Sequence, residues 1–433
     1  MPATRTEHDT MGEMPVPEDA LYGAQTARAV QNFPVGGPRL PRSFIRALGL
    51  IKACAARVNG APAIEAAALA VADGRHDDQF VVDVFQTGSG TSTNMNANEV
   101  IGHLAVAHPN DEVNRGQSSN DVFPSAIHIA AAETIVHKLL PAMQELEDEL
   151  ESKARQFQHI VKIGRTHLQD AVPMRLGQEF SGYAHQVRCA RERIALALPG
   201  IYELPLGGTA VGTGINAPIG FAPQVIACLA QITSLPFIET RNHFEAQAAR
   251  DAIVFLSGAL RTYAVALTKI ANDIRWLGSG PRCGLGELKL PAVQPGSSIM
   301  PGKVNPVIAE SVLMICAQVV GHDAAIAWCG AAGNFELNVM MPIIAYNVLD
   351  SIGLLAAGTQ NFARKLIKGL EADAEKATGF VEQSLAMGTA LVPEIGYEKA
   401  ADLVKEAYKT GKTVREVTPE NLRYLLDPTA DSL

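Results

Sequence analysis

The sequence predicts an all-α protein built around a bundle of long helices. In several long segments apolar residues recur at alternating steps of three and four, the spacing of a helix with one buried face. Segments with the alternating pattern of a strand are few. Of the 433 residues, 47 % are hydrophobic and 19 % charged, which is the balance of a globular protein, and the length favours more than one domain.

The clearest helical pattern lies in residues 252–278, where Ile253, Leu256 and Leu260 begin a long apolar seam. Four more segments repeat the pattern, at residues 139–157, 180–194, 307–320 and 343–362. Five such helices predict an extended bundle. Many of their remaining positions are alanine or weakly polar, so we expect bundles to pack against bundles in a homo-oligomer. The alternative is a monomer with a thick core.

The regions on either side of this bundle differ from it in composition. We therefore expect an N-terminal mixed, mainly helical domain at residues 1–117, a central bundle at 118–368 and a short C-terminal helical domain at 369–433. The best strand signals are VVDVF at 81–85 and IVKIG at 160–164.

The charge and cysteine content exclude several classes of protein. A net charge of −9 argues against nucleic-acid binding, which needs a basic surface. The six cysteines form no CxxC pair and most lie in apolar segments, as buried thiols do in a reducing compartment. We recognise no signal segment and no apolar run long enough to cross a membrane. The expectation is a soluble cytoplasmic protein with no metal and no cofactor.

The first of four polar clusters is QTGSGTSTNMNANEV, which contains Ser89, Gly90 and Thr91 in a turn. Glycine permits close backbone approach, and hydroxyls with free N–H groups can bind an anion. The alternative is a turn with a purely structural role.

The second cluster, HPNDEVNRGQSSND, ends in Ser118, Ser119 and Asn120, which are strong helix N-cap residues. The free N–H groups of a helix start carry a partial positive charge that suits a carboxylate. These residues could also serve only to cap the helix.

The third cluster is GRTHLQDAVP, where His167 precedes a predicted amphipathic helix. Its polar neighbours, among them Arg165 and Asp170, could tune its protonation, so a general acid or base is one interpretation. A histidine with no chemical role is the other.

The fourth cluster is PGSSIMPGKVNP at residues 295–306. Its glycines and prolines predict a loop that presents Ser297, Ser298 and the cation Lys303, with Asn305 capping the helix that follows. A cation, a helix N-terminus and small hydroxyls on a mobile lid suit an oxyanion. Glu310, one turn into the helix, could reach a histidine from another segment.

These clusters, together with LGGTAVGTGINAP at 206–218, resemble the aspartase/fumarase superfamily and in detail its class II fumarases. The resemblance covers nearly the whole chain, and GSSIMPGKVNP is its most specific part. It implies the three-domain aspartase/fumarase-like fold, whose five-helix bundles form the 20-helix core of a homotetramer. Each active site would then be shared between three subunits.

The resemblance also implies a role for individual residues. His167, Ser297 and Glu310 would be catalytic: His167 and Glu310 would act on the water at C2, and Ser297 would take the C3 proton. The substrate-binding residues would be Ser89, Gly90, Thr91, Ser118, Ser119, Asn120, Thr166, Ser298, Lys303, Val304 and Asn305. A second anion site would comprise His108, Pro109, Asn110 and Asp111. Ala105 stands where the family often has an arginine, so this second site is expected to be weakened or absent.

The activity implied is the reversible hydration of fumarate to (S)-malate, a step of the tricarboxylic acid cycle, through an aci-carboxylate intermediate. The alternative is an aspartate ammonia-lyase, but those relatives typically carry Gln at His167, Ala at Ser89 and MPAK in place of MPGK. A helical binding protein that has lost catalysis is a third possibility, and the complete set of site residues argues against it.

Overall fold

The computed structural model describes residues 3–427, and the chain packs into two compact units. Unit 1 comprises Met1–Pro141, Ala190–Ala264 and Ile315–Ala357. Unit 2 comprises Ala142–Cys189, Val265–Met314 and Gly358–Leu433. The domain boundaries near residues 117 and 368 stay a prediction.

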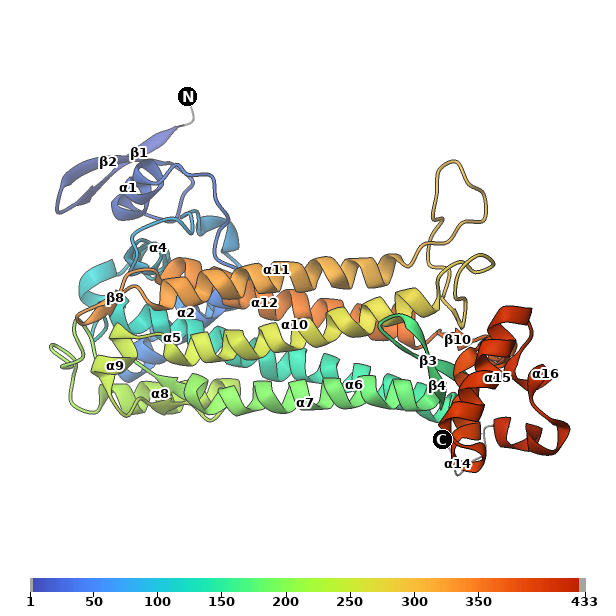
Figure 1. Cartoon of the computed structure of the whole chain (residues 1–433). Helices are drawn as coiled ribbons and strands as arrows, with labels where there is room; N and C mark the ends of the chain where they lie inside the picture. The colour runs from blue at the N-terminus through green and yellow to red at the C-terminus, as the bar shows by residue number, and fades with distance from the viewer. Residues whose placement is uncertain (1–2, 428–433) are drawn as a thin grey trace. The chain divides into compact units, whose positions relative to one another are not determined.

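Long helices dominate the chain, as the sequence predicts (Figure 1). Four of them contribute a segment to each unit: α7 (Leu176–Tyr202), α10 (Asp251–Leu277), α11 (Val307–Gly330) and α12 (Met341–Phe362). A further one begins as α5 (Ser119–Thr134), passes through the π-helical turn Ile135–Leu139 and continues as α6 (Leu140–Gln156). The predicted seam is buried, since Ile253, Leu256 and Leu260 are at most 1 % exposed.

Unit 1 adds shorter helices to its segments of the long ones. These are α1 (Ala24–Asn32), α2 (Arg42–Val58), α3 (Pro62–Ala72), α4 (Thr91–Ala105), α8 (Phe221–Thr233) and α9 (His243–Ala248). Helix α2 packs against α3, α5 and α8, and its residues from Ala47 to Ala56 are buried. Because α2 is packed between these helices, the side chains of its buried segment contact other helices of unit 1 and not solvent.

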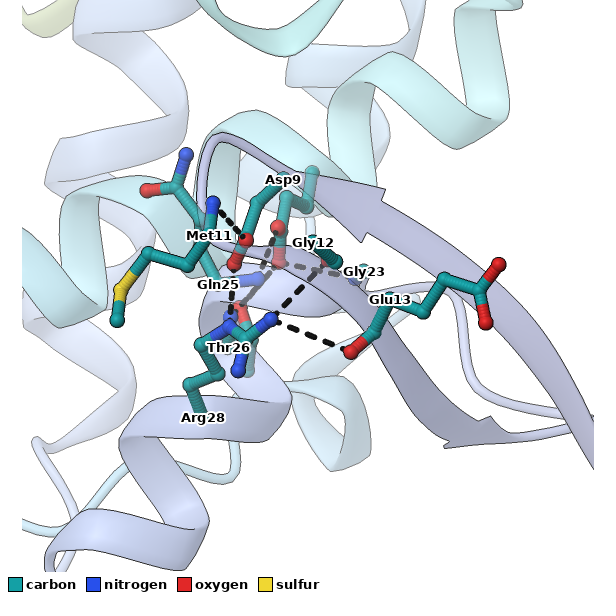
Figure 2. Close-up of polar contacts among 9 residues, drawn as sticks. Asp9, Met11, Gly12, Glu13, Gly23, Gln25, Thr26 and Arg28 are labelled. Atoms are coloured by element: carbon teal, nitrogen blue, oxygen red, sulfur yellow. Dashed lines mark hydrogen bonds and ion pairs between the residues drawn. The ribbon is translucent and has the colours of Figure 1, made fainter.

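An N-terminal hairpin of β1 (Thr4–Asp9) and β2 (Gly12–Pro17) also belongs to unit 1. Figure 2 shows how Arg28 of α1 holds its turn: Nε donates to Asp9 Oδ2 at 2.7 Å and Nη2 donates to the Gly12 carbonyl at 3.0 Å. The buried carboxylate of Glu99 caps α1 and accepts the backbone N–H of Thr26 at 3.1 Å. The sequence did not predict this hairpin because β1 is polar throughout and the apolar face of β2 is only Met14 and the buried Val16.

Unit 2 carries the C-terminal helices and a second hairpin, β3 (Val161–Thr166) with β4 (Gln169–Arg175). Its helices after α12 are α13 (Ala374–Gln383), α14 (Val392–Ile395), α15 (Tyr397–Thr410) and α16 (Val414–Val417), with the 3₁₀ turns Leu385–Leu391 and Glu420–Leu426. They share a small apolar core that includes Leu391, Ala400 and Leu426. The remaining strands are two-residue pairs: β5 (Glu203–Leu204) with β6 (Ile238–Glu239), β7 (Leu288–Lys289) with β10 (Glu371–Ala372), and β8 (Gly333–Asn334) with β9 (Leu337–Asn338).

Two sequence predictions need correction. The first is the segment VVDVF, which is not a strand, because only Asp83 pairs there, in a single bridge with Arg39, whereas IVKIG does begin β3. The expectation for the cysteines is confirmed for most of them: Cys54, Cys228, Cys316 and Cys329 are buried, Cys189 is partly exposed and Cys283 is exposed.

The second correction concerns apolar length. Asp251–Leu277, Val307–Gly330 and Met341–Ile367 are long and apolar enough, by length and composition, to cross a membrane. Large apolar side chains on two of these helices are exposed in the single chain: Trp328 and Met314 of α11 are 79 % and 68 % accessible, and Phe255 of α10 is 60 % accessible.

Candidate active site

The turn before α4 is shaped by glycines that no other residue could replace without movement. Gly90 has φ +75°, and a Cβ there would lie 2.1 Å from the ring of Phe123. A Cβ on Gly88 would lie 1.7 Å from the carbonyl oxygen of Val339. The turn is therefore pressed against α5 and the start of α12, and it presents Ser89 at the N-terminus of α4.

Helix α5 begins with a complete capping box. Ser118 Oγ accepts the N–H of Asn120 at 3.2 Å, and the Asp121 carboxylate accepts the N–H of Ser118 at 2.9 Å. Asn120 in turn donates its side-chain amide to the carbonyl of Ala210 at 2.8 Å, which ties the helix start to the 206–218 loop. The predicted N-cap at Ser118 is confirmed.

Unit 1 brings these two predicted binding segments together. Ser89 Oγ lies 2.8 Å from Thr91 Oγ1, and Asn94, one turn into α4, donates to Ser119 Oγ at 3.0 Å. The N-termini of α4 and α5 therefore lie side by side around the Gly90–Phe123 contact. Two adjacent helix starts with small hydroxyls can bind a carboxylate through N–H groups, O–H groups and dipoles.

The residues of the expected second anion site form a separate, exposed turn in unit 1. Pro109–Val113 is a π-helical turn capped by His108, whose Nδ1 accepts the N–H of Asp111 at 3.1 Å. The side chains of His108 and Asp111 are 55 % and 81 % exposed. Asn110 lies in the same turn, and its role in anion binding stays a prediction.

In unit 2, His167 lies at the tip of the β3–β4 hairpin. Thr166 pairs with Gln169, and the two turn residues His167 and Leu168 have φ values of 55° and 60°. Such a two-residue turn matches the twist of its strands and points both side chains outward. The prediction that a helix follows His167 directly is wrong, because α7 begins only at Leu176.

The base of this hairpin is fixed by buried charges. Glu287, fully buried, accepts from Arg165 Nη2 at 2.7 Å and lies 3.5 Å from Lys162 Nζ, which also contacts Glu179 at 2.9 Å. The Arg165 guanidinium stacks 5.6 Å over the ring of Phe380. The residues next to the exposed tip are thus anchored in the interior of unit 2.

The loop at 295–306, between α10 and α11 in Figure 1, closes on itself through its backbone. Gly296 N–H donates to the Lys303 carbonyl at 2.8 Å, and Asn305 Nδ2 donates to the Gly296 carbonyl at 2.6 Å. The Lys303 ammonium donates to Asn305 Oδ1. Asn305 therefore closes the loop with its side chain, and α11 begins after it at Val307, so the prediction that Asn305 is the cap is wrong in detail.

Ser297 has the surroundings that a basic hydroxyl needs. Its Oγ accepts two backbone N–H groups, from Ile299 at 3.2 Å and from Met300 at 3.0 Å. Two such donors stabilise negative charge on oxygen more than a neutral hydroxyl, so they favour its alkoxide. Ser298 and Val304 are exposed on the same loop.

The predicted partnership of His167 with Glu310 is not formed within one chain. Glu310 is half-buried in the first turn of α11, and among residues 3–427 no hydrogen bond joins its carboxylate to His167. The same described residues hold no group of three or more His, Cys, Asp or Glu that could bind a metal ion. The single chain thus presents one polar set in unit 1 and another in unit 2.

Sequence reasoning missed the buried residues that support these sets. Asn94, Asn96, Asn98 and Glu99 of α4 are all buried, as are Lys52, Asp121 and Glu287. The sequence held a signal for the α4 residues and for Lys52. Polar residues in an unbroken helical run, or a lysine in the apolar run ALGLIKACAA, are unfavourable in a core unless they have polar partners.

Comparison with known proteins identifies relatives along almost the entire sequence. The lyase family model matches residues 12–321, and a model of the fumarase C C-terminus matches residues 388–429. A fumarate hydratase class II from Mycobacterium tuberculosis is 56 % identical over 427 residues, covering 95 % of this chain and 90 % of the relative. The corresponding protein of Ralstonia nicotianae is 52 % identical over 434 residues, covering 95 % and 94 %.

A solved structure agrees with these matches. The class II fumarase from Schistosoma mansoni superimposes with a TM-score of 0.96 at 40 % identity, covering 100 % of this chain and 99 % of that one.

Proposed function

The chain belongs to the class II fumarate hydratase family of lyases, and we propose on this basis that it catalyses the reversible hydration of fumarate to (S)-malate. The observation that carries the proposal is the 56 % sequence identity with a fumarate hydratase class II, which covers 95 % of this chain. The proposed role is a step of the tricarboxylic acid cycle.

The polar set of unit 1 binds a substrate carboxylate in this proposal. Ser89, Thr91 and the Ser118–Asn120 turn offer hydroxyls, an amide and the N–H groups of two adjacent helix starts. These groups favour a dianion even though the chain carries a net charge of −9. Binding here would hold the double bond in a fixed place for the groups that move protons.

The polar set of unit 2 supplies the chemistry. In the dehydration direction Ser297 takes the C3 proton of malate, and the pair of electrons moves into the neighbouring carboxylate to form the aci-carboxylate. The Ile299 and Met300 N–H groups stabilise the Ser297 alkoxide that takes this proton, and Lys303 balances the negative charge that the aci-carboxylate gains. His167, assisted by Glu310, then protonates the C2 hydroxyl, which leaves as water. Hydration runs through the same steps in reverse.

A homotetramer with active sites shared between three subunits accounts for the remaining features. Unit 2 contains Thr166, His167, Ser297 and Lys303, and unit 1 contains Ser89 and Ser118. One copy of the chain can therefore supply the residues of unit 2 to substrate bound at the residues of unit 1 in another copy. Exposed apolar residues such as Phe255, Met314 and Trp328 supply surface for contacts between helices of different copies. With these faces covered by protein, we propose a cytoplasmic enzyme.

The residues at 108–111 carry a weaker proposal. We propose that His108 and the turn after it bind anions loosely, because Ala105 provides no guanidinium and the imidazole already accepts from the Asp111 N–H.

One assay tests the main proposal. Purified protein is mixed with fumarate, and loss of the double-bond absorbance is followed together with malate formation; aspartate is tested in parallel for ammonia release. We expect malate without any amine requirement. Ammonia release from aspartate with negligible malate turnover would overturn the proposal in favour of an ammonia-lyase.

A further inference from the structure

Lys52 is a lysine in the interior of an apolar helix. It lies in the middle of α2 and is 0 % exposed, with Ile51 and Ala53 buried on either side of it. Burial lowers the pKa of its ammonium to about 7. An ammonium in a core is unfavourable unless polar groups compensate for the lost water, so the groups around Lys52 indicate what the residue does.

The charge that compensates Lys52 belongs to the first turn of α5. The fully buried carboxylate of Asp121 opposes the lowering of the Lys52 pKa. Asp121 accepts the N–H groups of Ser118 at 2.9 Å, Gly207 at 3.0 Å and Thr209 at 2.9 Å. These bonds fix Asp121 in the first turn of the helix that we assign to substrate binding.

A short chain of hydrogen bonds joins Lys52 to Ser119. The Lys52 ammonium donates to Asn114 Oδ1 at 2.9 Å, and the same oxygen accepts from Asn94 Nδ2 at 3.2 Å. Asn94 Nδ2 also donates to Ser119 Oγ at 3.0 Å. Because Asn114 accepts from Lys52 and Asn94, its position fixes the orientation of the Asn94 amide and thereby the hydroxyl of Ser119.

A third donor shares the same oxygen. Asn98 Nδ2 of α4 also donates to Asn114 Oδ1 at 3.2 Å, so one lysine and two asparagines converge on a single amide oxygen. Buried polar groups of this kind need partners with fixed geometry. The shared oxygen therefore couples the position of Lys52 to the side chains that line the start of α5.

We propose that Lys52 is a positioning residue for the substrate carboxylate: through Asn114 and Asn94 it orients the hydroxyl of Ser119 at the N-terminus of α5. This inference rests on the proposed function. It concerns binding common to the ground state and the transition state, because Lys52 touches no reacting atom. Its loss should therefore change KM far more than kcat.

The experiment compares two buried lysines replaced by methionine. Lys52→Met removes the ammonium while keeping the length of the side chain. Lys153→Met is the matched control: Lys153 is 7 % exposed on α6 and donates to the Leu370 carbonyl at 2.7 Å, with no link to the site residues of unit 1. For each variant, KM and kcat for fumarate are measured beside Tm and oligomer size.

For Lys52→Met we expect KM to rise about tenfold with kcat changed less than about threefold, which is the pattern of lost uniform binding. For Lys153→Met we expect a lower Tm and an unchanged KM. If Lys52→Met leaves KM within about twofold of wild type, whatever its Tm, the inference is wrong.

A second variant keeps the test decisive if Lys52→Met does not fold. Asn114→Ala cuts the connection while retaining the lysine, and it should raise KM in the same way; an unchanged KM here also overturns the inference. If both variants fold, the double variant should be no worse than the more affected single one, because the two residues act in series. Wild-type protein is assayed first: failure to hydrate fumarate there counts against the proposed function, not against Lys52.

Discussion

The two polar sets of this chain are built in opposite ways. In unit 1, Ser119 and the Gly88–Thr91 turn are held by close backbone contacts and by buried side chains beneath them. In unit 2, His167 occupies an exposed hairpin tip and Ser297 a loop closed by a few hydrogen bonds. Buried support is present there too, at Glu287, but it lies at the base of the hairpin and not under the reactive groups.

The difference follows from what each set does in the proposed reaction. A carboxylate cradle works best when its donors are fixed before the substrate arrives, since no free energy is then spent on ordering them. Groups that move protons must meet substrate held on another copy, and exposed turns can reach a neighbour. Variants of the two sets should therefore fail differently, the first through stability and binding and the second through turnover.

The largest effect is expected at Ser297. Ser297→Ala removes the hydroxyl that accepts from Ile299 and Met300, so kcat should fall by about 10⁴-fold or more, the upper range for a proton-transferring group. Tm and oligomer size should stay as in wild type because the loop is exposed. Measured kcat near wild type would show that another group takes the C3 proton.

His167→Asn should be the next most severe change, lowering kcat by about 10²–10⁴-fold, since an amide cannot exchange the proton of the attacking water. The hairpin should persist because asparagine tolerates the positive φ of this turn. Circular dichroism checks that the fold persists, and the rate of fumarate hydration measures the fall in kcat. A fully active variant would remove His167 from the mechanism.

A pair of glycine variants tests the rigidity of the two sets directly. Gly90→Ala forces a Cβ to 2.1 Å from Phe123 at φ +75° and should lower the free energy of unfolding by roughly 3 kcal/mol. Gly302→Ala has a similar φ of +81° but open space around its Cβ, so it should lower that free energy by only about 1 kcal/mol. Denaturant unfolding of both variants measures the difference, and equal losses would contradict it.

The smallest effect concerns the N-terminal hairpin of unit 1. The hydrogen bond from Arg28 lowers the pKa of Asp9, so the ionised carboxylate adds stability above about pH 4 that is lost as the pH falls through the folded-state pKa. Asp9→Asn should lower stability by less than about 1 kcal/mol at pH 7 and by a smaller amount at pH 2. Thermal melts at both pH values compare it with wild type, and an equal deficit at both would exclude the ion pair as its cause.

The sequence predicts a helix correctly where the spacing of apolar residues matches the face that the fold buries. The seam through Leu256 and Leu260 predicts α10 because a helix that buries one face needs that spacing. The segment VVDVF was wrongly predicted to be a strand, because a short apolar run is equally compatible with a buried extended segment that pairs with no other strand. The β1–β2 hairpin was missed because β1 is polar and the apolar face of β2 is only Met14 and Val16. These two pack with Ala20, Ala27 and Tyr22, and Arg28 binds Asp9 at the turn.

The amino-acid order by itself determined the long helices, the capping box at Ser118 and the glycine-rich turns, because each depends on residues within a few positions of one another. Only the tertiary structure decided that Asn94 lies against Ser119 and that Lys52 donates to Asn114 beside them. Those contacts depend on how distant helices pack, and side-chain packing across long sequence separations leaves no periodic trace in a single chain.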